Sequence, residues 1–346
     1  MKYYVLAAAA TLLACSGSTT SNGEGNNPYG ITATGPGVLS VSPLDTSDID
    51  AVTPLGYLAP PGHVLPTDHV YLMFVDPWNG QQQNADCRQR PVLAAGSGVV
   101  TFTLVTESAG DTKVDIQMTR TFHYYYDHVL LRSGISVGSH VQAGDTIATT
   151  TGRCPSIDLG VYDADQTPSG FVNPDRYGES TGHAVSPYKY FSEPLRSAMY
   201  RRVRLFEGVP ADKDGRVDWG VKGRLSGDWF HQSLASASAG TVMGPTGWPL
   251  TLSFARDWFD GTPRISLGGT IADPGVLRPA PTDPDPVNVS VASGFVAFRG
   301  TPVLGRIAAG WVAAQMQSDN ILRIEFFPGS GPAPTAFTSA AQLYVR

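Results

Sequence analysis

Residues 126–163 decide the fold, and they read YDHVLLRSGISVGSHVQAGDTIATTTGRCPSIDLGVYD. Apolar residues recur here at a period of two, which is the spacing of strands with one buried face. Glycines separate the apolar runs and supply the turns between them. The stretch therefore predicts antiparallel β-structure packed against a core. The apolar positions are Ile135, Val137, Val141, Ile147, Ile157, Leu159 and Val161, and the turn positions are Gly134, Gly138, Gly144 and Gly152.

Three segments carry motifs that occur together in one family. They are residues 91–100 (PVLAAGSGVV), the step Tyr126-Asp127-His128-Val129 and residues 137–147 (VGSHVQAGDTI). In that order they resemble the PV-x-A-x-x-x-G-x-V turn, the Tyr-x-His-Leu step and the V-x-x-G-x-x-V-x-x-G-x-x-Ile segment of lysostaphin-type (LytM-like) zinc endopeptidases, which cut peptidoglycan cross-links. The resemblance covers about residues 55–165. It implies the antiparallel β fold of that family, with His128 in the position that stabilises the transition state.

The last strand of the stretch departs from the family motif. Ser156-Ile157-Asp158-Leu159-Gly160-Val161 falls where the family has His-x-His-x-Glu-Val, so both histidines are replaced. One of these histidines is a zinc ligand in the family, and Asp158 stands at its position. The resemblance therefore implies the fold, whereas peptidase activity does not follow from it.

Candidate metal ligands lie just before the first buried strand of this domain. The family has a His-x-x-x-Asp pair of zinc ligands there, but the residue four after His63 is a threonine. His63, Asp68 and His69 still offer three ligands in seven residues, and a zinc site needs about three N, O or S ligands plus water. We predict His63, His69 and Asp158 as metal ligands, because two histidines and a carboxylate can hold a divalent ion. His128 is then the catalytic residue opposite them. The alternative is a groove that lost its metal, in which these groups hydrogen-bond one another.

The composition favours a β-rich protein of two domains. At 346 residues the chain is longer than one typical domain. Its 38 glycines and 27 prolines favour turns and strands over helices. A net charge of −6 without a basic run excludes nucleic acid as a partner. We therefore expect a mainly β fold, with a degenerate lysostaphin-like sheet domain at residues 51–200 and a second β domain at residues 201–346.

The second domain is marked by repeated short β-like runs. Their regular spacing and the Gly or Pro turns between them predict a sandwich or a closed barrel. Five prolines in residues 273–286 predict a long loop. A barrel of about eight strands can hold one small ligand, although no motif selects one. The predicted runs are residues 203–206, 250–254, 264–267, 287–291, 295–298, 311–316, 321–327 and 343–345.

The N-terminus has the features of an exported lipoprotein. A short positive region precedes an apolar run at residues 5–13, which is too short to span a bilayer and is typical of a signal peptide. Leu12-Leu13-Ala14-Cys15 resembles a bacterial lipobox, so residues 1–14 are the expected signal peptide and Cys15 the lipidated first residue. Several acyl chains give a stable membrane anchor. Ser16 after the cysteine indicates the outer membrane, and the polar composition of residues 15–50 predicts a disordered tether.

Two further cysteines, Cys87 and Cys154, form an even pair in an exported chain and predict a disulfide. The resemblance places both of their loops near the groove of the sheet domain. A role as metal ligands is the weaker alternative, because the chain has no CxxC spacing.

Two function classes follow from these observations. The first is an envelope lipoprotein whose degenerate LytM-like domain binds peptidoglycan or an envelope protein without catalysis. The second is a metal-dependent peptidase with altered zinc ligands that acts on cell-wall peptides. The loss of both histidines from the last strand favours the first class.

Overall fold

The computed structural model describes residues 27–74, 87–106, 110–152, 156–204, 208–210, 212–257 and 261–346. The expected signal peptide, Cys15 and Cys154 lie outside these ranges. Residues 31–346 belong to one compact unit. Among the described residues, no helix is both long enough and apolar enough to cross a membrane.

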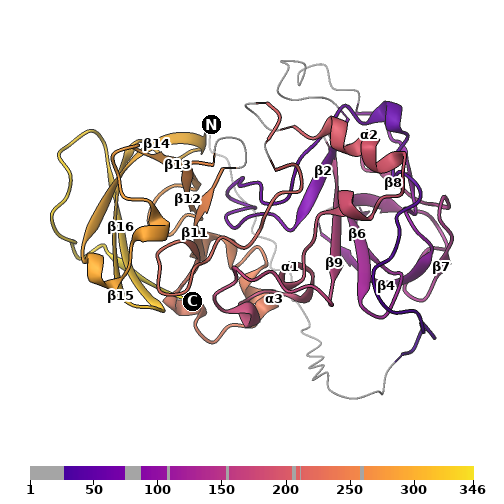
Figure 1. Cartoon of the computed structure of the whole chain (residues 1–346), viewed down its shortest axis with the longest axis horizontal. Helices are drawn as coiled ribbons and strands as arrows, with labels where there is room; N and C mark the ends of the chain where they lie inside the picture. The colour runs from indigo at the N-terminus through magenta and orange to yellow at the C-terminus, as the bar shows by residue number, and fades with distance from the viewer. Residues whose placement is uncertain are drawn as a thin grey trace, which may run out of the picture. The chain divides into compact units, whose positions relative to one another are not determined.

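The sheet domain is antiparallel throughout, as its period-two pattern predicts (Figure 1). The main path of the sheet runs β1-β2-β9-β6-β5-β4-β7, while β8 pairs with both β6 and β3. The fold class predicted for this domain is therefore confirmed. Its strands are β1 (Ala51–Val52), β2 (His69–Met73), β3 (Pro91–Leu93), β4 (Gly98–Val105), β5 (Asp111–Gln117), β6 (Phe122–Leu131), β7 (His140–Val141), β8 (Thr146–Thr150) and β9 (Ser156–Asp163).

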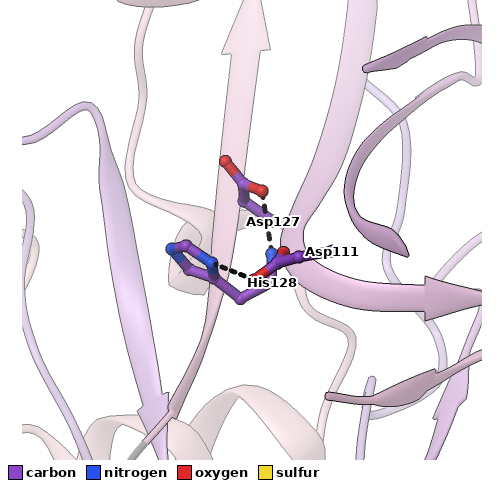
Figure 2. A group of neighbouring side chains, drawn as sticks. All are labelled: Asp111, Asp127 and His128. Atoms are coloured by element: carbon purple, nitrogen blue, oxygen red, sulfur yellow. Dashed lines mark hydrogen bonds and ion pairs between the residues drawn. The ribbon is translucent and has the colours of Figure 1, made fainter. Parts of the chain in front are cut away.

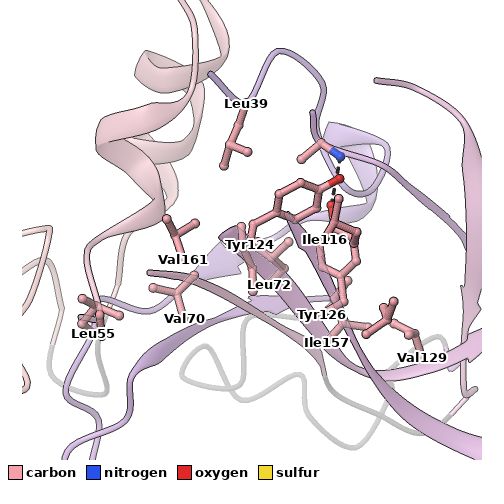
Figure 3. Close-up of a cluster of buried hydrophobic side chains, with 14 of the residues drawn as sticks. Leu39, Leu55, Val70, Leu72, Ile116, Tyr124, Tyr126, Val129, Ile157 and Val161 are labelled. Atoms are coloured by element: carbon pink, nitrogen blue, oxygen red, sulfur yellow. Dashed lines mark hydrogen bonds between the residues drawn. The ribbon is translucent and has the colours of Figure 1, made fainter. Parts of the chain in front are cut away.

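One face of the sheet packs against a core of aliphatic and tyrosine side chains (Figure 3). Ile157, Leu159 and Val161 of β9 are fully buried, in agreement with their alternation in the sequence. Tyr126 is also fully buried, and its hydroxyl donates to the Leu93 carbonyl at 2.9 Å and accepts from the Ala95 N–H at 3.1 Å. Such a buried tyrosine is stable because its polar end is hydrogen-bonded. The opposite face of the sheet is therefore the face that can hold a polar functional site.

The expected tether at residues 15–50 is wrong for its second half. The Ala33 carbonyl accepts from the Arg120 N–H at 2.9 Å, and the Leu39 N–H donates to the Tyr190 carbonyl at 2.9 Å. Leu39, Leu44 and Ile49 are at most 2% exposed, so three apolar residues of this stretch enter the core, whereas Val38 is 58% exposed. A short 3-10 helix, η1 (Thr46–Asp48), precedes β1. The polar composition gave a wrong prediction of disorder here, because three buried apolar side chains suffice to hold an otherwise polar segment in place.

The C-terminal domain is a closed barrel of eight antiparallel strands (Figure 1). Of the two folds that the sequence predicts for this domain, a sandwich or a barrel, the barrel is therefore the one that forms. Trp229, Phe254 and Phe298 are at most 1% exposed and belong to its buried cluster, so the barrel has a packed interior. The strands are β10 (Gly227–His231), β11 (Thr251–Arg256), β12 (Pro263–Leu267), β13 (Gly275–Pro279), β14 (Val296–Gly305), β15 (Gly310–Ser318), β16 (Ile321–Pro328) and β17 (Gln342–Val345).

Three expectations for this domain are corrected. In the described part of the run predicted at residues 203–206, Val203 makes an isolated bridge to Val52 and belongs to no strand. The run predicted at residues 287–291 is not a strand, because the 3-10 helices η8 (Pro286–Asn288) and η9 (Val291–Ser293) occupy it. The loop predicted at residues 273–286 contains β13, which ends at Pro279. A strand tolerates proline at its end, where the missing N–H leaves no gap in the ladder.

Short helices connect the two β domains and continue beyond β10. The connection between the domains contains η4 (Pro174–Arg176), α1 (Glu179–Gly182), η5 (Pro187–Tyr190) and α2 (Leu195–Arg202), and η5 lies within the helix expected near residues 187–191. After β10 come η6 (Gln232–Leu234), α3 (Ala239–Val242) and η7 (Trp248–Leu250). A bridge between Tyr162 of β9 and Ala184 holds the α1 segment against the sheet. This contact places α1 beside the polar face.

Candidate functional site

Strand register brings His69, Asp158 and Asp127 to one face of the sheet. Tyr71 pairs with Asp158, so His69, two residues before Tyr71, projects to the same side as Asp158. On the other flank of β9, Asp127 of β6 pairs with Asp158. Residues far apart in the sequence thus meet on three adjacent strands, β2, β9 and β6.

His128 reaches this face through a β-bulge. Two residues of β6, Asp127 and His128, oppose the single residue Lys113 of β5, because Tyr126 pairs with Val114 and Val129 with Thr112. His128 has a φ of +64°, in the left-handed region that non-glycine residues seldom adopt. The Asp127 carboxylate accepts from the His128 N–H at 2.8 Å and stabilises the bulge. Simple alternation would send Asp127 and His128 to opposite faces, and the bulge overrides it.

The Asp158 carboxylate lies at the centre of the resulting cluster. Its Oδ2 atom is 3.3 Å from Nε2 of His69 and 3.7 Å from Nε2 of His128. Asp158 is 3% exposed and His69 is 8% exposed, whereas the His128 side chain is 37% exposed. The structure therefore brings together His69, His128 and Asp158, all of which the sequence singles out.

A second carboxylate lies behind each imidazole. Nδ1 of His69 is 2.9 Å from Asp68 Oδ1, and Nδ1 of His128 is 3.1 Å from Asp111 Oδ2. Figure 2 shows the contact between His128 and Asp111, and the hydrogen bond that the His128 N–H donates to Asp127. A carboxylate at Nδ1 keeps the proton on that nitrogen, which leaves Nε2 as the free lone pair.

The Asp68 carboxylate is itself held in place by two hydroxyls. Tyr125 donates to its Oδ1 at 2.8 Å, and Thr181 of α1 donates to its Oδ2. The Tyr125 ring lies where a side chain at Gly160 would project, so any Cβ at that position would overlap it. The Lys113 ammonium lies 3.7 Å from the centroid of the same ring. Gly160, which stands where the family motif has a glutamate, thus leaves room for the Tyr125 ring, whose hydroxyl holds Asp68 in place.

Two buried atoms at the centre of the cluster have no hydrogen-bond partner, namely Nε2 of His69 and Oδ1 of Asp158. A buried carboxylate oxygen without a donor is costly, and so is a buried nitrogen without a partner. Such atoms are expected where a cation completes the site. The residues present therefore fit a divalent metal ion, with nitrogen and oxygen donors of the kind that zinc accepts.

The electrostatics of the cluster also favour positive charge. Burial tends to lower the pKa of His69, but Asp158 and Asp68 outweigh it and raise that pKa. Burial also tends to lower the pKa of His128, but Asp158, Asp127 and Asp111 outweigh it and raise that pKa. Burial raises the pKa of Asp158, against the effect of both imidazoles. The carboxylates thus outweigh desolvation at each imidazole.

His63 is placed differently from the other predicted ligands. Its ring lies 5.1 Å from that of His69, 6.0 Å from Tyr71 and 6.5 Å from Trp248, in aromatic contact with all three. Burial lowers the pKa of His63 to about 3, so the imidazole is neutral. The structure gives His63 a packing role beside the cluster, and its role as a metal ligand stays a prediction.

Asp111, Tyr125 and Thr181 are members of the site that the sequence analysis did not select. Tyr125 could have been found, since it shares a period of two with Asp127. Asp111 and Thr181 give no local signal: Asp111 comes into contact across the β5–β6 pairing, and Thr181 comes from a helix of the connection. Asp111, Asp127 and His128 also form a compact group whose ligand atoms lie within 4.8 Å of one another.

Cys87 is disulfide-bonded. Its expected partner, Cys154, lies outside the described residues, so the pairing stays a prediction.

No protein-family model and no curated protein matches the sequence. Solved structures give matches over part of the chain. Csd3 from Helicobacter pylori is 19% identical with a TM-score of 0.29, over 45% of this chain and 34% of Csd3. A zinc containing peptidase from Vibrio cholerae is 17% identical with a TM-score of 0.26, over 37% of this chain and 38% of the other. The catalytic domain of the antimicrobial peptidase lysostaphin from Staphylococcus simulans is 18% identical with a TM-score of 0.18. The match covers 23% of this chain and 67% of the lysostaphin domain. This chain therefore spans about a third of the length of Csd3.

Proposed function

We propose that this chain is a lipoprotein of the bacterial outer membrane whose LytM-like domain binds a cell-wall or protein partner without cutting it. The observation that supports the absence of catalysis is the make-up of β9. Ser156 and Gly160 stand where the family motif has a histidine and a glutamate. A serine hydroxyl does not take up a proton at neutral pH, so Ser156 cannot replace an imidazole as general base.

The partner is expected to meet the domain at the bulge of β6. Asp127 and His128 are the partly exposed members of the cluster, whereas Asp158 and His69 are buried. A carboxylate and an imidazole at a partly open site suit a polar peptide or a glycan hydroxyl. This location also agrees with the tendency of functional groups to sit at backbone irregularities such as bulges.

The second candidate is a metal-dependent peptidase with altered zinc ligands. The two unpartnered atoms, His69 Nε2 and Asp158 Oδ1, favour it, because they fit a metal ion. A bound zinc would polarise a peptide carbonyl and lower the pKa of an attacking water. The carboxylate ligand would add negative charge to the site and weaken the ion as a Lewis acid.

The test uses the purified full-length chain and purified cell walls, with added zinc and separately with a chelator. We expect the protein to sediment with the walls and to release no soluble muropeptides under either condition. The double variant Asp127→Asn/His128→Ala should sediment less, while the surface variant His140→Ala should sediment as the parent does. Chelator-sensitive release of muropeptides would overturn the proposal in favour of the peptidase. Failure to sediment would remove the wall as partner.

A further inference from the structure

We propose that two copies of this chain pair along the open edge of β4, antiparallel to each other and centred on Thr103. The open edge is residues 101–105, the part of β4 that extends beyond its short partner β7. A second copy supplies the strand that this part lacks. The inference goes beyond the proposed function and does not depend on it, because association is measured without a cell wall.

The open edge has a neighbouring strand on one side only. β7 pairs with β4 at Gly98 and Val99, and the last backbone hydrogen bonds on this side are made by Val100. Beyond Val100, β5 is the only strand beside β4 in the part of the chain that the structure describes. Such an edge presents backbone N–H and C=O groups that can pair with another chain.

The register between β4 and β5 shows which backbone groups point outward. The Thr106 N–H donates to the carbonyl of the first residue of β5 at 2.9 Å, in the same register as the strand pairs. Hydrogen-bonded and non-hydrogen-bonded pairs alternate along an antiparallel ladder. Phe102 and Leu104 therefore bond to β5. Thr103 and Val105 turn their N–H and C=O groups to the open side.

The most exposed side chains of this edge are apolar. Phe102 is 44% exposed, Leu104 is 50% exposed and Val105 is 63% exposed. Residues 98–105 read GVVTFTLV and contain no charged residue, although charged side chains commonly protect an edge strand from pairing. The chain has a net charge of −6, so two copies repel each other. An uncharged edge lets them meet without placing like charges opposite one another.

Antiparallel pairing about Thr103 is self-complementary. The two copies of Thr103 face each other and exchange both backbone hydrogen bonds, as a hydrogen-bonded pair requires. Phe102 of each copy lies opposite Leu104 of the other, and Thr101 lies opposite Val105, so apolar and β-branched side chains meet their own kind. A two-fold axis at Leu104 obeys the same backbone rule but forms one apolar pair in place of two. Because both copies use the same surface, the assembly closes as a dimer.

The size of the contact predicts a weak dimer. Stable interfaces bury about 1,200–2,000 Å², and residues 101–105 alone cover much less than that. Dimers are therefore expected at high protein concentration. The predicted lipid anchor would raise the effective concentration by holding the copies on one membrane.

The experiment is sedimentation velocity of the purified full-length chain over a concentration series. We expect monomers to give way to dimers as the concentration rises. Phe102→Lys and Leu104→Glu should each weaken dimerisation by about tenfold or more, because a charge then faces an apolar side chain. The double variant Phe102→Lys/Leu104→Glu should restore it, since opposite charges then face each other across the axis. Val303→Lys, at an exposed position of the barrel, should dimerise as the parent does.

Disulfide trapping tests the register. Facing residues of a hydrogen-bonded pair have Cα atoms about 5.5 Å apart, within the range of a disulfide. Thr103→Cys should therefore give a covalent dimer on a non-reducing gel after mild oxidation, whereas Leu104→Cys and the parent should give little. Covalent dimers of Leu104→Cys in place of Thr103→Cys would overturn the register.

Two other outcomes would overturn the pairing itself. The first is a parent chain that stays monomeric at every concentration. The second is a single charged variant, Phe102→Lys or Leu104→Glu, that dimerises as the parent does while circular dichroism shows it to be folded. If Thr103→Cys cross-links in cells to a different envelope protein and not to itself, the edge belongs to that partner.

Discussion

His128 shows how one backbone angle can change the chemistry of a strand. A left-handed conformation costs roughly 1–2 kcal/mol for a residue with a side chain. The chain retains it at His128, where φ is +64°, and uses the Asp127 carboxylate to hold the N–H. The result is that two consecutive residues contribute to one site. Strained conformations of this kind concentrate at functional positions.

At the same scale, Asp115 is expected to destabilise the fold at neutral pH. Burial raises the pKa of Asp115 to about 6, from a usual value of 3.8. The folded state therefore holds the proton more tightly than the unfolded state, and the free energy of unfolding falls as pH rises from about 4 to about 6. Two pKa units correspond to about 3 kcal/mol. Asp115→Asn should remove this loss and raise stability at pH 7 by up to that amount.

Urea unfolding of the parent and Asp115→Asn at pH 4 and pH 7 measures the effect. The difference between the two proteins should be small at pH 4 and large at pH 7. Asp175→Asn, at an exposed position of η4, serves as the control and should show no such change. A difference that is equal at both pH values would contradict the prediction.

At the scale of elements, β9 and β6 depend on the absence of a side chain at Gly160. A Cβ there would overlap the ring of Tyr125, which is 2% exposed and cannot move without breaking its bond to Asp68. Gly160→Ala should therefore lower the free energy of unfolding by about 1–3 kcal/mol, as overpacking does.

Thermal unfolding of Gly160→Ala tests this point. Gly240→Ala in α3 is the matched control: no atom lies within 4 Å of the added Cβ, and alanine suits a helix better than glycine. Unchanged melting of Gly160→Ala would show that the Tyr125 ring moves aside for the added methyl group without cost.

The strands were predictable to the extent that they alternate. Ile157, Leu159 and Val161 indicated β9 because apolar side chains on one face of a strand recur at a period of two, although the residues between them are buried as well. The barrel strands were found for the same reason, except β10 and β13. Proline-rich sequence concealed β13, whose single proline, Pro279, is its last residue.

The site was predictable only in part. His128 and Asp158 were selected from their motif positions, and His69 from its place just before the first buried strand. The structure brings the three together. The place of His128 in the cluster depends on a bulge, which is set by pairing between β5 and β6 and not by local sequence. Thr181 acts across 113 residues, and such a contact leaves no trace in a linear pattern.

At the scale of the whole molecule, the membrane anchor is the prediction with the largest effect. Cys15→Ser should prevent lipidation and release the protein into the soluble periplasmic fraction, because no acyl chains then bind the bilayer. Immunoblots of membrane and soluble fractions measure this. Ser18→Ala should leave the protein with the membrane. If Cys15→Ser stays in the membrane fraction after a high-salt wash, the anchor assignment is wrong.

The hydrogen bond at Ala33 limits how far an anchored domain could travel from its membrane. A chain spans at most about 3.3–3.6 Å per residue, so 35 residues between Cys15 and Asp50 would have allowed about 120 Å. Because the Ala33 carbonyl already accepts a hydrogen bond from Arg120, Cys15, the expected site of lipidation, precedes the folded body by only 18 positions. The upper bound on its radius of action is then about 65 Å. A target deeper in the envelope would have to come to the protein.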